Sequence, residues 1–214
     1  MINFTKNSFY KKIIVINCVL FFIIFKIAKP EDIIKESKDI EDYLQNLSPV
    51  EIFFSQTSEN KLSEKGWMII SRTEKARIEF APPNNMVLVA DGKWFMIHDP
   101  VSFKTSYLPI DFGPFKSLIN PREFFLNSNF EIEYKYLPSE KIVMKISFTD
   151  DKGNKMPVYL DMYFTKSPIS LYGWKVIDSQ KNVIVVKIDK IKKYIDGSEN
   201  KYIFNLTEKM RNSG

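Results

Sequence analysis

Few side chains in this sequence could support catalysis. His98 is the only histidine among the 214 residues, so we exclude zinc sites built on several histidines, Ser-His-Asp triads and Cys-His dyads. His98 follows Met96 in an aromatic segment, and we interpret it as a structural residue. Ser58-Glu59-Asn60-Lys61 fits the S-x-x-K pattern of serine-lysine acyl enzymes, but this tetrapeptide is common by chance and the accompanying motifs are missing.

The remaining candidates for chemistry are also better explained by structure. Asp150 and Asp151 are paired carboxylates, but the sequence D-D-K-G-N around them is typical of a solvated turn. No glycine-rich phosphate loop or dinucleotide motif is present. We therefore expect no enzymatic activity, no cofactor and no metal ion.

Apolar binding is the chemistry that the composition favours, because the chain holds 18 Phe, 10 Tyr and 3 Trp. Period-two alternation predicts an apolar strand face that also carries Arg72, where a guanidinium without partners would be costly. An apolar strand face of this kind could bind acyl chains, with a favourable free energy of roughly 0.8 kcal/mol per buried CH₂. Core filling is the alternative explanation. The apolar residues predicted on this face are Met68, Ile70, Ala76, Ile78 and Phe80.

Four short strands must position this face, and they lie between Gly66 and Pro100. The segment 82–85, Pro-Pro-Asn-Asn, separates the second strand from the third. Asp91-Gly92 is the strongest two-residue hairpin signal in the chain, and it predicts the turn between the third strand and the fourth.

Helices are predicted both before and after these strands. A helix is predicted over Pro30–Leu47, followed by a strand at Val50–Phe54 and a polar loop at Thr57–Lys65. The segment Asp111–Leu126 predicts two short apolar helices, each with proline in its first turn, that must cover part of the sheet. An ordinary packed corner of the core is the alternative explanation for this segment.

Further short strands complete the pattern, so that about ten are spaced every 8 to 12 residues. This arrangement indicates a curved antiparallel sheet that closes toward a barrel. The additional strands are predicted at Phe103–Leu108, Phe130–Tyr136, Ile142–Phe148, Val158–Phe164, Trp174–Asp178, Val183–Ile191 and Tyr202–Leu206.

The amino terminus predicts export. Three lysines precede the uncharged run Ile13–Phe25, and Ala28 is a small residue at a possible cleavage point, so we interpret 1–28 as a signal peptide. An uncleaved membrane anchor is the alternative. Residues 1–28 contain four lysines and no acid, so the remainder, 29–214, is close to neutral, contains no cysteine and offers no basic footprint for nucleic acid. We expect 29–214 to form one domain.

The motifs between Gly66 and Pro100 resemble a known family. G-W-M-I-I-S-R-T followed by M-V-L-V-A-D-G-K-W-F-M-I-H-D-P is similar to the LolA family of periplasmic lipoprotein carriers, and Phe54-Ser55-Gln56 resembles the F-x-Q end of that family's first strand. Thr73 stands where the family usually has proline, and Lys116 and Ser117 stand where it is usually apolar. The closing strand pair, L-Y-G-W-K-V-I-D-S-Q-K-N-V-I-V-V-K-I, is similar too, although Lys181 stands where glycine is common.

The resemblance implies an α+β fold, an incomplete antiparallel barrel of about ten to eleven strands with a helical lid formed by 30–47 and 111–126. It implies a monomeric periplasmic carrier that takes lipoproteins by their acyl chains from an ATP-driven inner-membrane release complex to an outer-membrane acceptor. By the resemblance, Arg72 holds the lid shut, Phe54 joins the cavity face, and the lid residues are Phe115, Leu118 and Ile119. A periplasmic regulator that shares the half-barrel and binds other proteins is the alternative function.

Overall fold

The computed structural model describes residues 30–58, 63–71, 75–110, 116–126, 129–150 and 152–194, and for 30–34 only the helical backbone. Residues Glu36–Gly214 form one compact unit, and Met1–Lys35 form another. Several sequence predictions therefore lie outside the described residues: the signal peptide 1–28, Lys61, Arg72, Phe115, Asp151 and the strand at Tyr202–Leu206.

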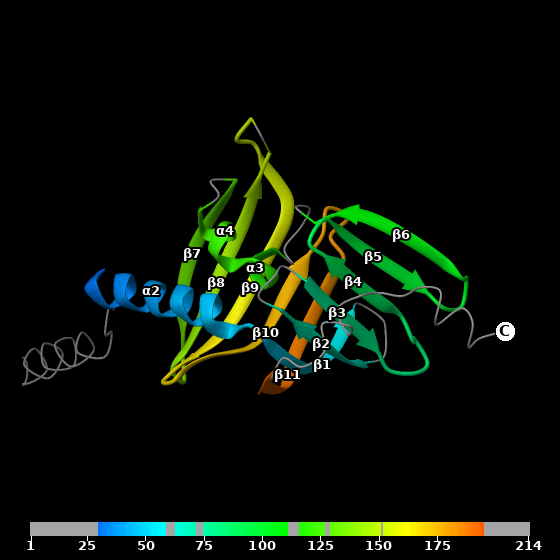
Figure 1. Cartoon of the computed structure of the whole chain (residues 1–214). Helices are drawn as coiled ribbons and strands as arrows, with labels where there is room; N and C mark the ends of the chain where they lie inside the picture. Colours follow the sequence, from blue (N-terminus) through cyan, green and yellow to red (C-terminus); the bar gives the residue numbers. More distant parts are fainter. Residues whose placement is uncertain are drawn as a thin grey trace, which may run out of the picture. The chain divides into compact units, whose positions relative to one another are not determined.

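The described part of the chain contains one sheet of eleven strands in the order β6-β5-β4-β3-β2-β1-β11-β10-β9-β8-β7. Every neighbouring pair is antiparallel, and β6 and β7 are the two edges, so the sheet does not close into a barrel (Figure 1). This confirms the predicted fold class. The strands are β1 Val50–Ser58, β2 Glu64–Ile70, β3 Lys75–Phe80, β4 Val87–Asp91, β5 Trp94–Asp99, β6 Lys104–Pro109, β7 Phe130–Leu137, β8 Lys141–Thr149, β9 Lys155–Lys166, β10 Ile169–Ile177 and β11 Val183–Lys193.

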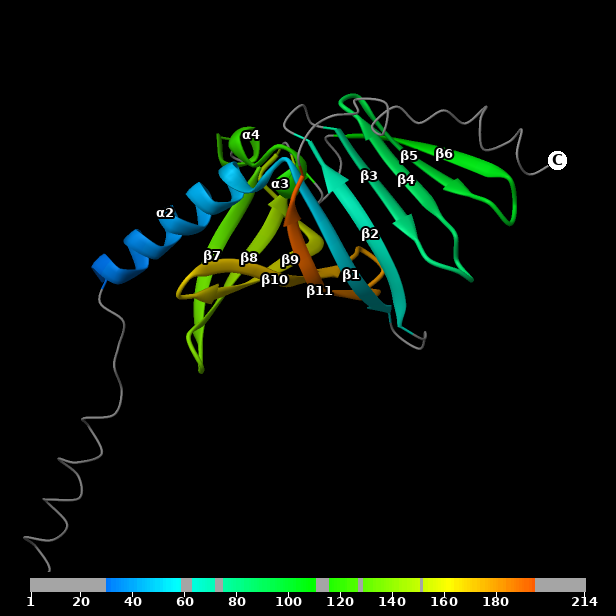
Figure 2. The same cartoon turned by 60° about the horizontal axis from the view of Figure 1, so that its bottom comes forward.

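Within the described residues, three helices accompany the sheet. Helix α2 spans Pro30–Leu47, as predicted, because Pro30 suits a first turn and the apolar residues recur at helical spacing. The two short helices are α3, Lys116–Ile119, and α4, Pro121–Leu126. Both views show α3 and α4 beside the β7–β9 half of the sheet, with β6 at the opposite edge (Figures 1 and 2).

Two local predictions need correction. The hairpin turn consists of Gly92 and Lys93, and Asp91 ends β4, because its carboxylate accepts the backbone N–H groups of Lys93 and Trp94 at 2.8 and 2.7 Å. Gly92 adopts a φ of 97°, which favours glycine. Strand β10 begins at Ile169, five residues earlier than the predicted Trp174, because the turn at 167–168 leads directly into the ladder with β9.

The sheet has an inner face, on which the helices pack, and an outer face. Pairing across β1, β2 and β3 places Ile52, Met68 and Ile78 in one row of the inner face. They belong to the same buried cluster as Leu44 of α2 and Leu118 of α3. Some outer-face residues of β2 and β4 are also buried, namely Ile69, Val87 and Val89, whereas Arg77 and Glu79 of β3 between them are only partly buried.

Gly66 allows the inner face to close at one end of β2. A Cβ added at Gly66 would lie 2.6 Å from Cζ of Phe54 and 2.8 Å from the backbone oxygen of Glu79. The Phe54 ring can shift, but the backbone oxygen cannot move without disturbing the β2–β3 ladder. We expect Gly66→Ala to lower the free energy of unfolding by about 1–3 kcal/mol, measured by urea denaturation. Lys65→Ala, at the exposed neighbouring position, is the control, and equal stability of both variants would contradict this packing.

Candidate functional site

The inner face of β1–β5 is a continuous apolar wall. One row runs from Ile52 through Met68 and Ile78 to Leu88 and Ile97, each residue paired with the next across the strands. A parallel row consists of Val50, Ile70, Ala76, Ala90 and Phe95. No charged residue of the described chain interrupts these two rows between β1 and β5.

The structure brings together the apolar residues that the sequence placed on this face. Met68, Ile70 and Ala76 are at most 2% exposed and Ile78 is 7% exposed. Phe54 and Phe80 meet edge to face, with ring centroids 5.6 Å apart. The packing of this face is therefore as predicted, and its part in ligand binding belongs to the proposal below.

Helices α3 and α4 fill the space above the β7–β9 half of the inner face. Leu118, Ile119 and Phe124 are 6%, 3% and 3% exposed, and all three belong to the main core cluster. The Phe124 ring stacks on Phe130 of β7 with centroids 4.1 Å apart and planes 2° apart. The short helices thus act as a plug made of large apolar side chains.

The two polar residues that depart from the family pattern are accommodated by specific partners. Ser117 is completely buried, and its hydroxyl donates to Sδ of Met162 in β9 at 3.8 Å. Lys116 extends to the carboxylate of Glu123, with Nζ 3.0 Å from Oε1. Both contacts tie α3 to its surroundings, so the polar residues do not loosen the plug.

Helix α2 is held at the other end of the β7–β9 half by contacts that sequence reasoning missed. The buried carboxylate of Glu36 lies 2.5 Å from Nζ of Lys166, at the end of β9. Tyr43, two turns further on, packs edge to face on Phe164 with centroids 6.2 Å apart. Helical spacing marked the apolar stripe of α2, but an ion pair between residues so distant in sequence leaves no local signal.

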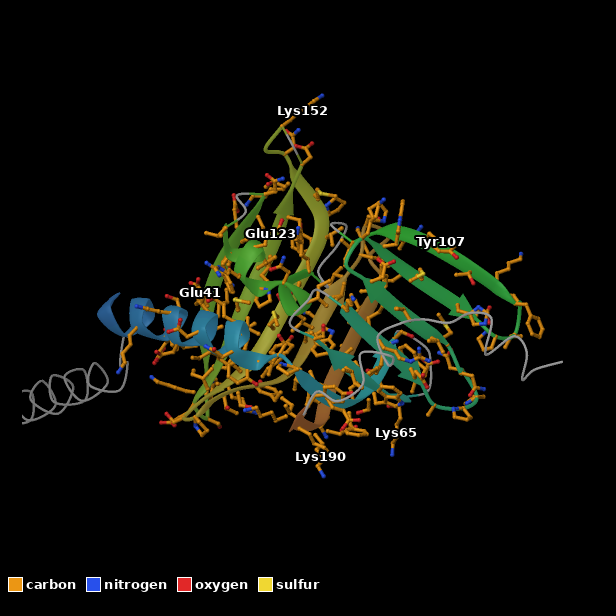
Figure 3. The ribbon with its side chains drawn as sticks, viewed as in Figure 1. Glu41, Lys65, Tyr107, Glu123, Lys152 and Lys190 are labelled. Carbon is orange, nitrogen blue, oxygen red and sulfur yellow. The ribbon has the colours of Figure 1, made fainter. Side chains whose placement is uncertain are left out.

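Tyr134, on the inner face of β7, has a shifted pKa. Burial raises the pKa of Tyr134 to about 12, and the nearby carboxylate of Glu41 on α2 adds to the shift. Figure 3 shows Glu41 on α2. Tyr134 therefore reports whether α2 covers this part of the sheet.

The shift predicts an alkaline loss of stability. Between pH 10 and about 12 the unfolded chain releases the phenolic proton of Tyr134 while the folded chain retains it, so the free energy of unfolding falls as the pH rises through this interval. Tyr134→Phe should make this decline shallower in urea titrations at each pH. Tyr159→Phe, at an exposed position of β9, is the control. A decline in Tyr134→Phe as steep as in wild type would show that Tyr134 is not buried under α2.

The outer face carries an ion-pair cluster that ties three strands together. Asp161 of β9 is 6% exposed, and its two carboxylate oxygens lie 3.0 Å from Nζ of Lys145 and 3.1 Å from Nζ of Lys175. The hydrogen bond with Asp161 raises the pKa of Lys175. Because a carboxylate between two ammonium groups is fully engaged, we assign the cluster a structural role.

The residues considered for catalysis are placed as structural residues. His98 is 5% exposed, and its Nδ1 lies 3.1 Å from Oγ1 of Thr105 on the neighbouring strand. Asp150 closes its turn by accepting the backbone N–H groups of Lys152 and Asn154, and hydrogen bonds led by the Asn154 side chain lower its pKa. Within the described residues, no three metal-ligating side chains gather in one place.

Two pockets bounded by described residues lie near the 82–85 turn, with volumes of about 350 and 390 Å³. The smaller is lined by polar groups such as Glu64 and Asp99, and the larger reaches Trp67 on the outer face. Neither includes Ile78 or Leu88 of the inner-face row. None of the described helices is long and apolar enough to cross a membrane.

Comparison with known proteins identifies the family. The family model for the outer membrane lipoprotein carrier protein LolA matches residues 45–205. The chain belongs to the LolA family. This match spans β1 to β11 and both short helices, so the whole inner face lies within the part of the chain that defines the family. No curated protein matches the sequence at a significant level.

Three solved structures are similar to this LolA-family chain at low sequence identity. A putative outer membrane lipoprotein-sorting protein domain from Vibrio parahaemolyticus has 9% identity and a TM-score of 0.48, covering 80% of this chain and 96% of that one. A LolA superfamily protein from Nitrosomonas europaea has 8% identity and a TM-score of 0.42, covering 78% and 97%. A chain of the MucA/MucB complex of Pseudomonas aeruginosa has 9% identity and a TM-score of 0.40, covering 77% and 60%.

Proposed function

We propose that this LolA-family protein is a periplasmic carrier that buries the acyl chains of lipoproteins against its inner face and moves them from the inner to the outer membrane. The observation that carries the proposal is the uninterrupted apolar wall of β1–β5, which lies within the family match at 45–205. A wall of this kind can take up acyl chains and offers no group for covalent chemistry, so binding and release are reversible.

The described structure corresponds to the closed carrier, because its inner face is filled by its own side chains. An acyl chain must displace Leu118, Ile119 and Phe124, whose burial is worth about 1.5–3 kcal/mol each. Burying about ten methylenes of the acyl chain stabilises the complex by about 8 kcal/mol. This gain is comparable with the free energy needed to expose these three side chains. Loading and release are then close to balanced, as a shuttle requires.

The remaining parts of the proposal come from the resemblance to the LolA family. Residues 1–28 direct export and are removed, and the mature protein, 29–214, receives lipoproteins from an ATP-driven inner-membrane complex. An outer-membrane acceptor then takes them over. Arg72 hydrogen-bonds the closed helices at the mouth, since a guanidinium offers five donors that backbone carbonyls can accept.

A transfer experiment tests the proposal. Spheroplasts that synthesise a labelled lipoprotein are incubated with the purified protein, and the released complex is then mixed with outer-membrane vesicles. We expect the label to leave the spheroplasts only when the protein is present and to appear in the vesicles afterwards. The matched control is the same lipoprotein with its acylated cysteine replaced by serine, which should not be bound.

The same experiment separates the carrier from a regulatory module that binds polypeptide. A regulator would bind the unacylated polypeptide as well as the acylated one, because its contacts are made to the chain itself. Equal binding of both forms, or no release from spheroplasts, would overturn the carrier proposal.

A further inference from the structure

One row of apolar side chains on the inner face crosses six strands. Antiparallel pairing places one residue of each strand in line, starting on β11, crossing β1, β2, β3 and β4, and ending on β5. Figure 2 shows these strands side by side in this order. The residues of this middle row are all large and apolar, and they are Ile191, Ile52, Met68, Ile78, Leu88 and Ile97.

Both ends of the middle row are defined by the pairing. On β5 the row ends at Ile97, because the next position, Ser106 of β6, is polar and exposed. On β11 it ends at Ile191, because β10 pairs with β11 only as far as Lys187. The middle row therefore has a fixed length.

This length is close to that of a long fatty acyl chain. Six strands are separated by five steps of about 4.8 Å, so the middle row is about 24 Å long. An extended alkyl chain, with C–C bonds of about 1.5 Å, advances by about 1.3 Å per methylene. About eighteen methylenes therefore span the row.

The apolar wall is much shorter in the direction of the strands. On β1 its residues run from Val50 to Phe54, four steps of about 3.3 Å each, or about 13 Å. The next inner-face position is Gln56, which pairs with Glu64. The Glu64 carboxylate accepts a hydrogen bond from the side-chain amide of Asn84 at 2.9 Å. A long acyl chain laid along the strands would meet these polar groups, so the direction across the strands is favoured.

The two flanking rows offer less surface to a ligand than the middle row does. One of them has Ala76 and Ala90 at its centre, and both side chains are completely buried. The other is interrupted by Gly66, which has no side chain. In the middle row, Leu88 and Ile97 are only half-buried, so part of this row is accessible even in the closed protein.

We propose that acyl chains lie across the strands, along the middle row, and that the length of this row sets the chain length that the protein binds best. This inference rests on the proposed carrier function and specifies its ligand. Each methylene that contacts the row leaves water, so binding strengthens with chain length until the row is covered. Methylenes beyond about eighteen extend past Ser106 or Ile191 into water and add no affinity.

A chain-length series tests the inference. Synthetic lipopeptides of one sequence, each with a single saturated acyl chain of about 8 to about 24 carbons, compete with a fluorescent lipopeptide for the purified protein. We expect the dissociation constant to fall about fourfold per methylene and to level off at about 18 carbons. A dissociation constant that keeps falling to the longest chain would overturn the inference. So would levelling off at about ten carbons, the length of the wall along the strands.

Extending the row is a sharper test. Ser106→Ile adds one strand to the row, or about four methylenes, at an exposed position that leaves the core untouched. The dissociation constant should then level off at about 22 carbons, and a chain of about 22 carbons should bind at least tenfold more tightly than it binds the wild-type protein. Chains of about 10 carbons should bind both proteins equally. Tyr107→Ile, at the next position of β6 on the outer face, is the matched control and should behave as wild type.

Shortening the row is the complementary change. Ile97→Ser should move the levelling-off point to about 14 carbons, because the row then ends at Leu88. An unchanged levelling-off point in both variants, with acyl chains still bound, would overturn the inference and leave the carrier proposal in place. Binding of no acyl chain of any length would contradict the carrier proposal as well.

Discussion

Leu88→Glu is expected to abolish acyl-chain binding while the protein remains folded. Leu88 lies in the inner-face row between Ile78 and Ile97, and it is only half-buried, so the folded state can tolerate a carboxylate there. An acyl chain laid over this row would have to desolvate the charge, which costs several kcal/mol. A loss of about 3 kcal/mol corresponds to a more than hundredfold weaker complex.

The choice of Leu88 follows from burial. Charges at Ala76 or Ile78 would also block the wall, but these side chains are 0% and 7% exposed and the substitutions would unfold the protein. Met96→Glu is the matched control, because Met96 is half-buried on the neighbouring strand and pairs with Val89 on the outer face. Lipoprotein transfer should fail in Leu88→Glu and persist in Met96→Glu. Normal transfer by a folded Leu88→Glu protein would place the ligand elsewhere.

Phe124→Ala is expected to lower the free energy of unfolding by about 3–5 kcal/mol, the usual cost of truncating a buried phenylalanine. Phe124 is 3% exposed, stacks on Phe130 and meets Phe125 edge to face at 5.4 Å. Its removal leaves α4 without its main anchor, because the other aromatic residue of the helix is only half-buried. Denaturant unfolding gives the free energy directly.

The control is Leu126→Ala in the same helix, since Leu126 is 80% exposed and should change stability by less than about 0.5 kcal/mol. A plug that has lost its anchor opens more often, so hydrogen exchange of α3 and α4 amides should accelerate in Phe124→Ala while β8 and β9 stay protected. Equal stability of the two variants would mean that α4 does not hold the inner face closed.

Periodicity predicted the sheet and the helices because each element carries a local signal. Residues 131–135 alternate charge and apolar side chain, and the observed β7 alternates exposure in the same way. The apolar run Met86–Ala90 differs, since strands buried on both faces have continuous rather than alternating hydrophobicity. The burial of Val87 and Val89 on the outer face agrees with this pattern, from which only a strand, and not the burial of both faces, was predicted.

The contacts that hold the helices could not be read from the sequence. Glu36 and Lys166 look like ordinary surface residues of a helix and a strand end, and only the fold brings their charges within 2.5 Å. Ser117 looked like a polar interruption of an apolar helix until the structure placed Met162 beside its hydroxyl. Such pairings depend on how the sheet curves, which local spacing does not encode.

Photocrosslinking at two adjacent residues tests whether the inner face binds acyl chains. Phe95 and Met96 are neighbours on β5, but Phe95 pairs with Ala90 on the inner face and Met96 pairs with Val89 on the outer face. Each is replaced in turn by a photoreactive phenylalanine derivative, and the protein is loaded with a lipoprotein that carries radiolabelled acyl chains. We expect the label to become attached to the protein from position 95 and not from position 96. Absence of label at position 95, or equal labelling from both positions, would contradict the claim that the inner face binds acyl chains.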